Sequence, residues 1–199
     1  GSVGSPYSLT FTATGGTGPY AFTYAGLPPG LAGAGGVVSG TPTAGGAYDV
    51  EVFATETPTG CSASNRFQLI IGTPVSAGSV VISEFRARGP NGAYDEYVEI
   101  GNRTASDIVV LDPDGSGGWS IGRPGEVLAI IPDGTVIPKG GHWLATGVDF
   151  SLTSFGVPDP VGYGDLQMSG FEIPDDAGFG LFTSIDPGKY ALGTRLDAV

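Results

Sequence analysis

Glycine and proline interrupt this sequence so often that few stretches are long enough to form a helix. The 199 residues include 36 glycines and 16 prolines, and both types are unfavourable in the interior of a helix. Between them lie short runs rich in valine, isoleucine, threonine, tyrosine and phenylalanine, the residues that prefer strands. Because these apolar runs are bounded by turn-forming residues, the sequence predicts an all-β protein.

Apolar and polar residues alternate in the first third of the chain. In residues 7–13, the side chains of Tyr7, Leu9 and Phe11 share one face, while serine and threonine occupy the other. Residues 48–54 and 66–71 alternate in the same way. We therefore expect roughly six or seven short strands in this part, arranged as a small β-sandwich.

A change of composition after residue 71 predicts a domain boundary. The segment "GTPVSAGS" (72–79) has the small and turn-forming residues of a linker. We expect a first domain over residues 1–73, a linker over 74–79 and a second all-β domain over 80–199. Residues 149–176 show no strand pattern and are predicted to form a large loop or insertion. The final "TRLDAV" reads as the middle of a strand, which predicts that the sequence is a piece of a longer protein.

Eight basic residues stand against twenty acidic ones, so the net charge is −12 at pH 7. A negative surface repels phosphate backbones and anionic lipids, which disfavours nucleic acid and membrane surfaces as partners. No apolar stretch approaches the roughly 20 residues that span a bilayer, and no signal peptide is recognisable. Acidic chains do attract Ca²⁺, so calcium is the cofactor to consider.

Nucleophilic catalysis and zinc binding lack the residues that they need. His142 and Cys61 are the only histidine and the only cysteine. A Ser-His-Asp arrangement requires a histidine, but His142, in "KGGHWLAT", is interpreted as the start of a strand. Pairing Cys61 with His142 would join residues of two predicted domains, and one residue of each type cannot build a closed zinc site. We expect no catalytic residues.

The stretch "GPNGAYDEYVEI" (89–100) is the strongest candidate for acid–base chemistry because it holds Asp95, Glu96 and Glu99. In a strand over residues 95–100, Glu96 would face the opposite side from Asp95 and Glu99. Asp95 and Glu99 would lie about 13 Å apart, which exceeds the roughly 6.5–9.5 Å of an inverting glycosidase pair. We therefore interpret these carboxylates as part of a structural strand.

A hairpin through "GPNG" would give these acids partners. If residues 80–88 and 95–100 pair across this turn, then Glu84, Arg86 or Arg88 lies opposite them. The sequence predicts charge pairing here rather than catalysis.

Two short acidic segments are candidate calcium sites. "DPDGSG" (112–117) places Asp112 and Asp114 at alternate positions with a glycine at the sixth, as a calcium loop begins. Its twelfth position is Arg123 instead of glutamate, and the same residues suit an Asp-Pro-Asp-Gly turn, which we favour. In "IPDDAG" (173–178), Asp175 and Asp176 are weaker candidate ligands.

Five short elements follow one another in the first predicted domain: "GSPY" (4–7), "GGTGPY" (15–20), "LPPGL" (27–31), "SGTP" (39–42) and "GAY" (46–48). In this order they resemble the immunoglobulin-like repeat of bacterial surface and secreted proteins. The closing "TGCSASNRFQLII" also fits, which implies that Cys61 is a feature of the family rather than a nucleophile.

The second predicted domain contains "VVISEFRARGPNGAYDEYVEIGNRT" (80–104), Trp119 and "IPDGTVIPKGGHWLATG" (131–147), with "DDAGFGLFTS" and "RLDAV" towards the end. These segments resemble the bacterial lamin-tail domain, another immunoglobulin-like sandwich. Residues 149–176 depart from the pattern. Both resemblances imply non-catalytic modules of extracellular bacterial proteins.

Taken together, these features predict two tandem immunoglobulin-like β-sandwich domains of a secreted or cell-surface protein. Their expected role is structural or adhesive, with self-association into a fibre by strand addition as one form. Two alternatives stay open: an accessory or anchoring module of a larger secreted hydrolase, and a calcium-stiffened adhesin domain. The expected partners are proteins, either other copies or neighbouring domains, with carbohydrate as a further candidate ligand.

Overall fold

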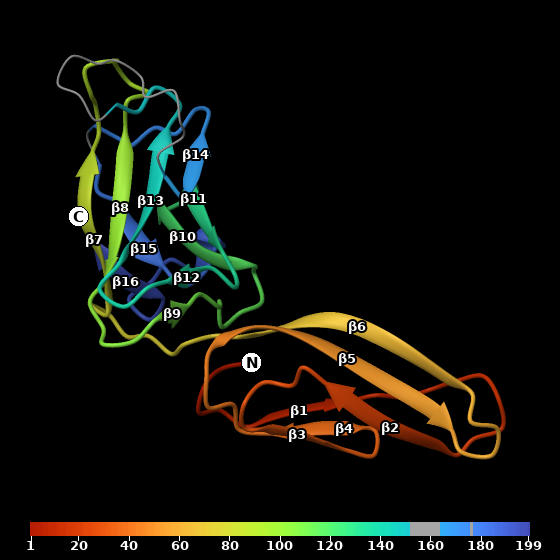
Figure 1. The fold of residues 1–199 in the computed structure, drawn as a ribbon. Helices are drawn as coiled ribbons and strands as arrows, with labels where there is room; N and C mark the ends of the chain where they lie inside the picture. The colour runs from red at the N-terminus through yellow and green to blue at the C-terminus, as the bar shows by residue number, and fades with distance from the viewer. Residues whose placement is uncertain (152–163, 176) are drawn as a thin grey trace. The chain divides into compact units, whose positions relative to one another are not determined.

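The computed structural model describes residues 1–151, 164–175 and 177–199, and over these residues the protein is all-β (Figure 1). The strands form several small sheets, and the helical structure in the described part is a single 3-10 turn, η1 (Pro187–Lys189). The all-β prediction is therefore confirmed. The described residues contain no helix that is long and apolar enough to cross a membrane.

The chain divides into two compact units, Gly1–Pro74 and Val75–Val199. Each unit has a hydrophobic cluster built from its own residues.

The first unit contains two antiparallel sheets of three strands each. The strand orders are β1-β4-β3 and β2-β5-β6. The strands are β1 (Tyr7–Thr10), β2 (Tyr20–Ala25), β3 (Leu31–Ala34), β4 (Val37–Gly40), β5 (Gly46–Glu56) and β6 (Ser62–Ile71). The β5–β6 ladder runs from Gly46 opposite Ile71 to Thr55 opposite Ser62 without a register shift.

Alternation along β5 and β6 forms the core of the first unit. Val50 and Val52 of β5 and Leu69 and Ile71 of β6 are buried together. Partly buried aromatic side chains from both sheets pack around them. The inward faces predicted for residues 48–54 and 66–71 are confirmed, because period-two alternation leaves only one face to bury.

The second unit contains two larger sheets and one short ribbon. The strand orders are β14-β13-β8-β7, β11-β10-β15-β16 and β12-β9, and all pairs are antiparallel except β13–β14. The strands are β7 (Val80–Arg86), β8 (Tyr97–Asn102), β9 (Ile108–Val109), β10 (Gly118–Arg123), β11 (Glu126–Pro132), β12 (Val136–Ile137), β13 (His142–Gly147), β14 (Leu166–Met168), β15 (Gly180–Phe182) and β16 (Arg195–Ala198).

The core of the second unit lies between its two four-stranded sheets. Trp119 of β10 is completely buried and Trp143 of β13 nearly so, with valine, isoleucine and leucine side chains from both sheets around them. Phe171 and Ile173 also enter this core, although they lie in the stretch predicted to be a loop. β14 lies in the same stretch, and a three-residue strand is too short for alternation to reveal it.

The segment predicted as a linker is held to the second unit by specific contacts. Val75 packs against the core of that unit, and the N–H of Gly78 donates to the carbonyl of Leu196 at 2.9 Å. Residues 75–79 therefore belong to the folded second unit. Small and turn-forming residues suit a tight surface turn as well as a flexible linker, so composition alone could not separate the two.

Candidate functional site

The carboxylates of the 89–100 stretch lie at the start of β8, where the predicted strand is wrong at its first two residues. β8 begins at Tyr97, so Asp95 and Glu96 belong to the preceding loop. The turn that begins at Gly89 continues to Asp95, whose N–H donates to the carbonyl of Gly92 at 3.3 Å. Both acids are buried, although the strand predicted from the sequence places them on opposite faces.

Asp95 is fully buried and is surrounded by donors. It forms an ion pair with the guanidinium of Arg86 and accepts hydrogen bonds from the N–H and hydroxyl of Ser151 at 2.8 and 2.9 Å. The N–H of Asn91 donates to it at 3.1 Å. A carboxylate with these partners fixes the loop at the start of β8, as a hydrogen-bonded and charge-paired group is expected to do.

Glu96 is also buried, at 2% exposure, but its surroundings are less polar. Its carboxylate accepts a hydrogen bond from the N–H of Ile173, which is itself in the core. Burial raises the pKa of Glu96 above its ordinary value, and the hydrogen bond from Ile173 offsets this only in part. The side chain thus holds Ile173 against the start of β8 and is covered from solvent.

The predicted hairpin through "GPNG" is confirmed, and its register shows which β7 residues meet the acids. Arg86 is opposite Tyr97, and Glu84 is opposite Glu99 after a bulge. The hydroxyl of Tyr97 donates to Glu84. Burial and this hydrogen bond raise the pKa of Tyr97 to about 12. The expected charge pairing is therefore present, between Arg86 and Asp95.

Glu99 lies between a serine and the single histidine, in an order that does not suit a catalytic triad. The hydroxyl of Ser83 donates to Glu99 Oε1 at 2.7 Å, and His142 Nε2 lies 3.7 Å from the same oxygen. In a triad the histidine must stand between the serine and the acid. His142 is exposed and begins β13, as predicted, while Cys61 is an exposed free thiol of the first unit.

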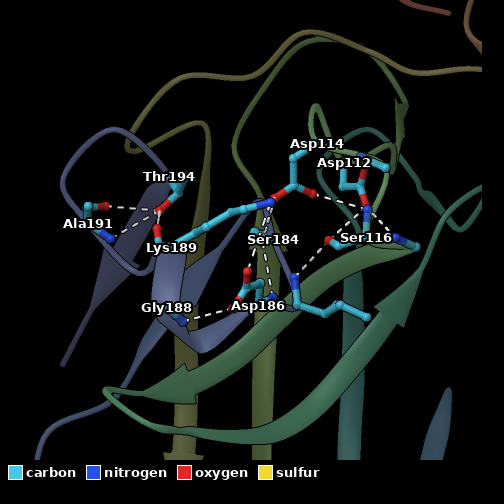
Figure 2. Close-up of polar contacts among 12 residues, drawn as sticks. Asp112, Asp114, Ser116, Ser184, Asp186, Gly188, Lys189, Ala191 and Thr194 are labelled. Atoms are coloured by element: carbon cyan, nitrogen blue, oxygen red, sulfur yellow. Dashed lines mark hydrogen bonds and ion pairs between the residues drawn. The ribbon is translucent and has the colours of Figure 1, made fainter.

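Figure 2 shows the polar network around the candidate calcium loop, in which Asp112 organises its own loop. Its carboxylate accepts hydrogen bonds from the N–H groups of Gly115, Gly117 and Gly118 and from the hydroxyl of Ser116. Burial alone would raise the pKa of Asp112, but these hydrogen bonds together lower it below its ordinary value. Asp112 is therefore a buried anchor of the loop before β10.

Asp114 joins this loop to the loop that contains η1 (Figure 2). Its carboxylate accepts hydrogen bonds from Lys189 Nζ at 2.7 Å and from the hydroxyl of Ser184 at 2.9 Å. The hydrogen bond from Lys189 is the main reason why the pKa of Asp114 lies well below its ordinary value. A second link runs from the N–H of Ile185 to the hydroxyl of Ser116 at 3.1 Å.

The contacts at Asp112 and Asp114 favour the turn interpretation of the predicted calcium loop. Both oxygens of Asp112 accept hydrogen bonds from its own loop, and the ammonium of Lys189 lies beside Asp114 and 3.9 Å from Asp186. Within the described residues, no group of three or more histidine, cysteine, aspartate or glutamate side chains is placed to hold a metal ion. Calcium binding here stays a prediction.

Of the second candidate pair, Asp175 and Asp176, the structure describes only Asp175. Asp175 is exposed and forms an ion pair with Arg88 at 3.2 Å. Asp176 lies outside the described residues. This ion pair gives Asp175 a role at the surface, where such pairs stabilise a fold by no more than about 1 kcal/mol.

Sequence reasoning missed one buried carboxylate, Glu56, the last residue of β5. It is 8% exposed and accepts hydrogen bonds from the N–H groups of Thr17 and Gly18 at 2.5 and 3.1 Å. The hydroxyl of Thr59 also donates to it. A signal was present, because period-two alternation places Glu56 on the same inward face as Val50 and Val52.

The aromatic contact between Phe182 and Tyr190 left no such signal in the sequence. The two rings are stacked with centroids 4.0 Å apart, and the hydroxyl of Tyr190 lies 2.6 Å from that of Ser120. Tyr190 belongs to a loop, so its position depends on contacts across the sheet β11-β10-β15-β16.

The buried acidic side chains of the two units have the same kind of surroundings. They accept hydrogen bonds from backbone N–H groups or pair with arginine, and in doing so they fix loops at the ends of strands. No family model matches this sequence, and no curated protein matches it either.

Proposed function

We propose that both units are immunoglobulin-like sandwiches. Sandwiches of this class place strands A, B, E and D in one sheet and C, F and G in the other. In the first unit, the orders β1-β4-β3 and β2-β5-β6 correspond to B-E-D and C-F-G. This strand order is the single observation that carries the proposal.

The second unit supports the same proposal. Its sheet β11-β10-β15-β16 has the order C′-C-F-G, and β13-β8-β7 has the order E-B-A. The added edge strand β14, the parallel partner of β13, occupies the place of strand D. These strand orders agree with the resemblances of the two halves to bacterial immunoglobulin-like and lamin-tail modules.

The function that fits this architecture is that of a non-catalytic structural or adhesion module in an extracellular bacterial protein. The use of the buried carboxylates as loop anchors favours this role over hydrolysis, since a general acid or base must reach a substrate. Fold alone does not define function, so the proposal needs a test of location.

Exposed Cys61 provides that test. Intact cells that produce the parent protein from its own gene are treated with a membrane-impermeant maleimide, with Cys61→Ser as the control. We expect labelling of intact cells equal to that of lysed cells. Labelling that appears only after lysis would overturn the extracellular proposal. The sequence that flanks these two units in the gene tests the hydrolase alternative, because an adjacent catalytic domain would make them accessory modules of an enzyme.

A further inference from the structure

One long edge of the first unit is open over most of its length. β6 is the last strand in the order β2-β5-β6. Residues 1–3 cover one end of its free side: the ammonium of Gly1 donates to the carbonyl of Ile70 at 2.9 Å, and Ser2 forms a parallel bridge with Gly72. Along residues 62–69, the described structure provides no backbone partner on this side.

The contact between Gly1 and Ile70 shows which peptide groups of β6 face outward. In an antiparallel ladder, the groups bonded to the neighbour alternate along each strand. Every second residue of β6, counted back from Ile70, therefore directs its N–H and C=O away from β5. These residues are Ser62, Ser64, Arg66 and Gln68. Such a row of unpaired groups is a template for another strand. The partner that fits this edge is therefore a β-strand.

β6 lacks the features that usually keep edge strands apart. It has ten residues, contains neither proline nor lysine, and pairs with β5 without a bulge. Its single charged side chain, Arg66, forms an ion pair with Glu51 at 2.9 Å. Proline, lysine, bulges and short length are the common means of blocking edge-to-edge pairing, and this edge has none of them.

The distribution of charge favours the first unit as the place where two copies meet. Residues 1–74 contain three carboxylates and one arginine, so their net charge is −2, whereas residues 75–199 carry −10. Two units of low net charge can approach with little electrostatic repulsion, while strongly acidic units repel each other.

We propose that the open edge of β6 pairs with the same edge of a second copy of this chain, which gives a two-fold symmetric dimer. Two-fold symmetry makes the pairing antiparallel, and closed two-fold dimers are the commonest oligomers. When the axis passes through Asn65, Ser62 lies opposite Gln68 and Ser64 opposite Arg66, so all the outward groups find partners. In this register the two copies of Arg66 do not face each other, which avoids a like-charge pair.

This inference goes beyond the proposed function, because the dimer can form whatever role the protein has. Pairing along one strand buries less area than a standard interface, so we expect weak and concentration-dependent association. Sedimentation velocity of residues 1–199 over rising concentration should show a monomer–dimer equilibrium. A sample that stays monomeric throughout, or that forms open-ended polymers, would overturn the two-fold dimer.

A cysteine placed on the axis tests the register. In a Cys61→Ser background, Asn65→Cys places two thiols at directly opposite, non-hydrogen-bonded positions, close enough for a disulfide. Ala63→Cys is the matched control, since the two copies of residue 63 would lie about 13 Å apart along the strands. We expect oxidation to link Asn65→Cys into dimers and to leave Ala63→Cys monomeric. Equal cross-linking of the two variants would contradict the proposed register.

Removing one outward N–H tests the hydrogen bonds themselves. Ser64→Pro removes a donor that faces away from β5, a place where proline is tolerated in an edge strand. We expect it to weaken dimerisation about tenfold or more, because each dimer loses two hydrogen bonds, while Ser64→Ala keeps the wild-type affinity. Gln68→Pro provides a second variant if Ser64→Pro unfolds. Dimerisation unaffected in a folded proline variant would show that β6 is not the interface.

Discussion

Two buried carboxylates of the second unit have pKa values shifted in opposite directions. Asp112 is surrounded by N–H and hydroxyl donors that lower its pKa, whereas burial dominates at Glu96 and raises its pKa. The charged form of Asp112 therefore stabilises the fold, and the charged form of Glu96 opposes it.

Glu96→Gln should stabilise the protein at neutral pH, since glutamine keeps an acceptor for the N–H of Ile173 and removes the buried charge. Because the folded-state pKa of Glu96 is raised, the folded protein binds more protons than the unfolded chain above about pH 4.5, the ordinary value. Wild-type stability thus falls as pH rises through this range. We expect Glu96→Gln to melt roughly 2–4 °C higher at pH 7, the effect of about 1 kcal/mol, and the gap to close near pH 4.5. Calorimetry between pH 4.5 and pH 7 measures the melting temperatures of the wild type and the variant. A lower melting temperature for Glu96→Gln at pH 7 would disprove the prediction.

Asp112→Ala should destabilise the second unit by roughly 2–4 kcal/mol, because several backbone donors lose their acceptor at once. The matched control is Asp107→Ala, whose carboxylate is exposed and accepts from the N–H of Lys139. We expect that variant to lose no more than about 1 kcal/mol. Urea denaturation measures both changes.

EDTA separates the anchor role of Asp112 from the calcium alternative. If the loop is a turn, EDTA leaves the wild-type melting temperature unchanged. A decrease with EDTA that the double variant Asp112→Ala, Asp114→Ala abolishes would instead establish the calcium site.

At the scale of strands and turns, glycine meets two different requirements: a close approach of two backbone segments, and a positive φ. Gly26, just after β2, has a φ of +73°, in the left-handed region, and a Cβ there would lie 2.1 Å from the carbonyl oxygen of Asp49. Gly35, in the turn between β3 and β4, also has a positive φ, +56°, but a Cβ there would meet nothing within 4 Å. The two positions separate backbone strain from steric collision.

Gly26→Ala should destabilise the first unit by roughly 3 kcal/mol or more, because strain and collision with β5 act together. Gly35→Ala should remove only about 1–2 kcal/mol, the effect of a left-handed alanine alone. Thermal unfolding of the two variants measures the difference. Equal losses would mean that the approach of Gly26 to Asp49 is relieved by movement of the chain.

At the scale of the whole molecule, the two units differ in size, charge and core. The first has a small aliphatic core surrounded by partly buried aromatic side chains, and the second has a larger core around two tryptophans. Because each cluster is built from residues of its own unit, each unit has the interior that independent folding requires.

A fragment of residues 75–199 should therefore unfold cooperatively on its own. A fragment that begins at residue 80, the boundary predicted from composition, should be less stable by roughly 2–3 kcal/mol. It loses the packing of Val75 and the hydrogen bond from Gly78 to Leu196. Calorimetry of the two fragments tests this, and equal melting temperatures would show that residues 75–79 are a linker after all.

The sequence predicted those features that depend on neighbouring residues. The strand class, the inward faces of β5 and β6, and the β7–β8 hairpin all follow from alternation and turn composition. Turn chemistry also predicts local hydrogen bonds for Asp112, and the donors from its own loop lie within six residues of it. Glu56 could have been found by the same reasoning.

Only the tertiary structure decided the features that depend on residues far apart in the chain. Asp95 and Glu96 are buried because Ser151 and Ile173 fold over them, and Asp114 is paired because the η1 loop brings Lys189 beside it. Local periodicity determines which face of a strand is apolar, since it depends on spacing along the backbone. Whether a polar side chain at the end of a strand meets solvent, an arginine or a backbone N–H depends on how distant loops close, and no local pattern encodes that.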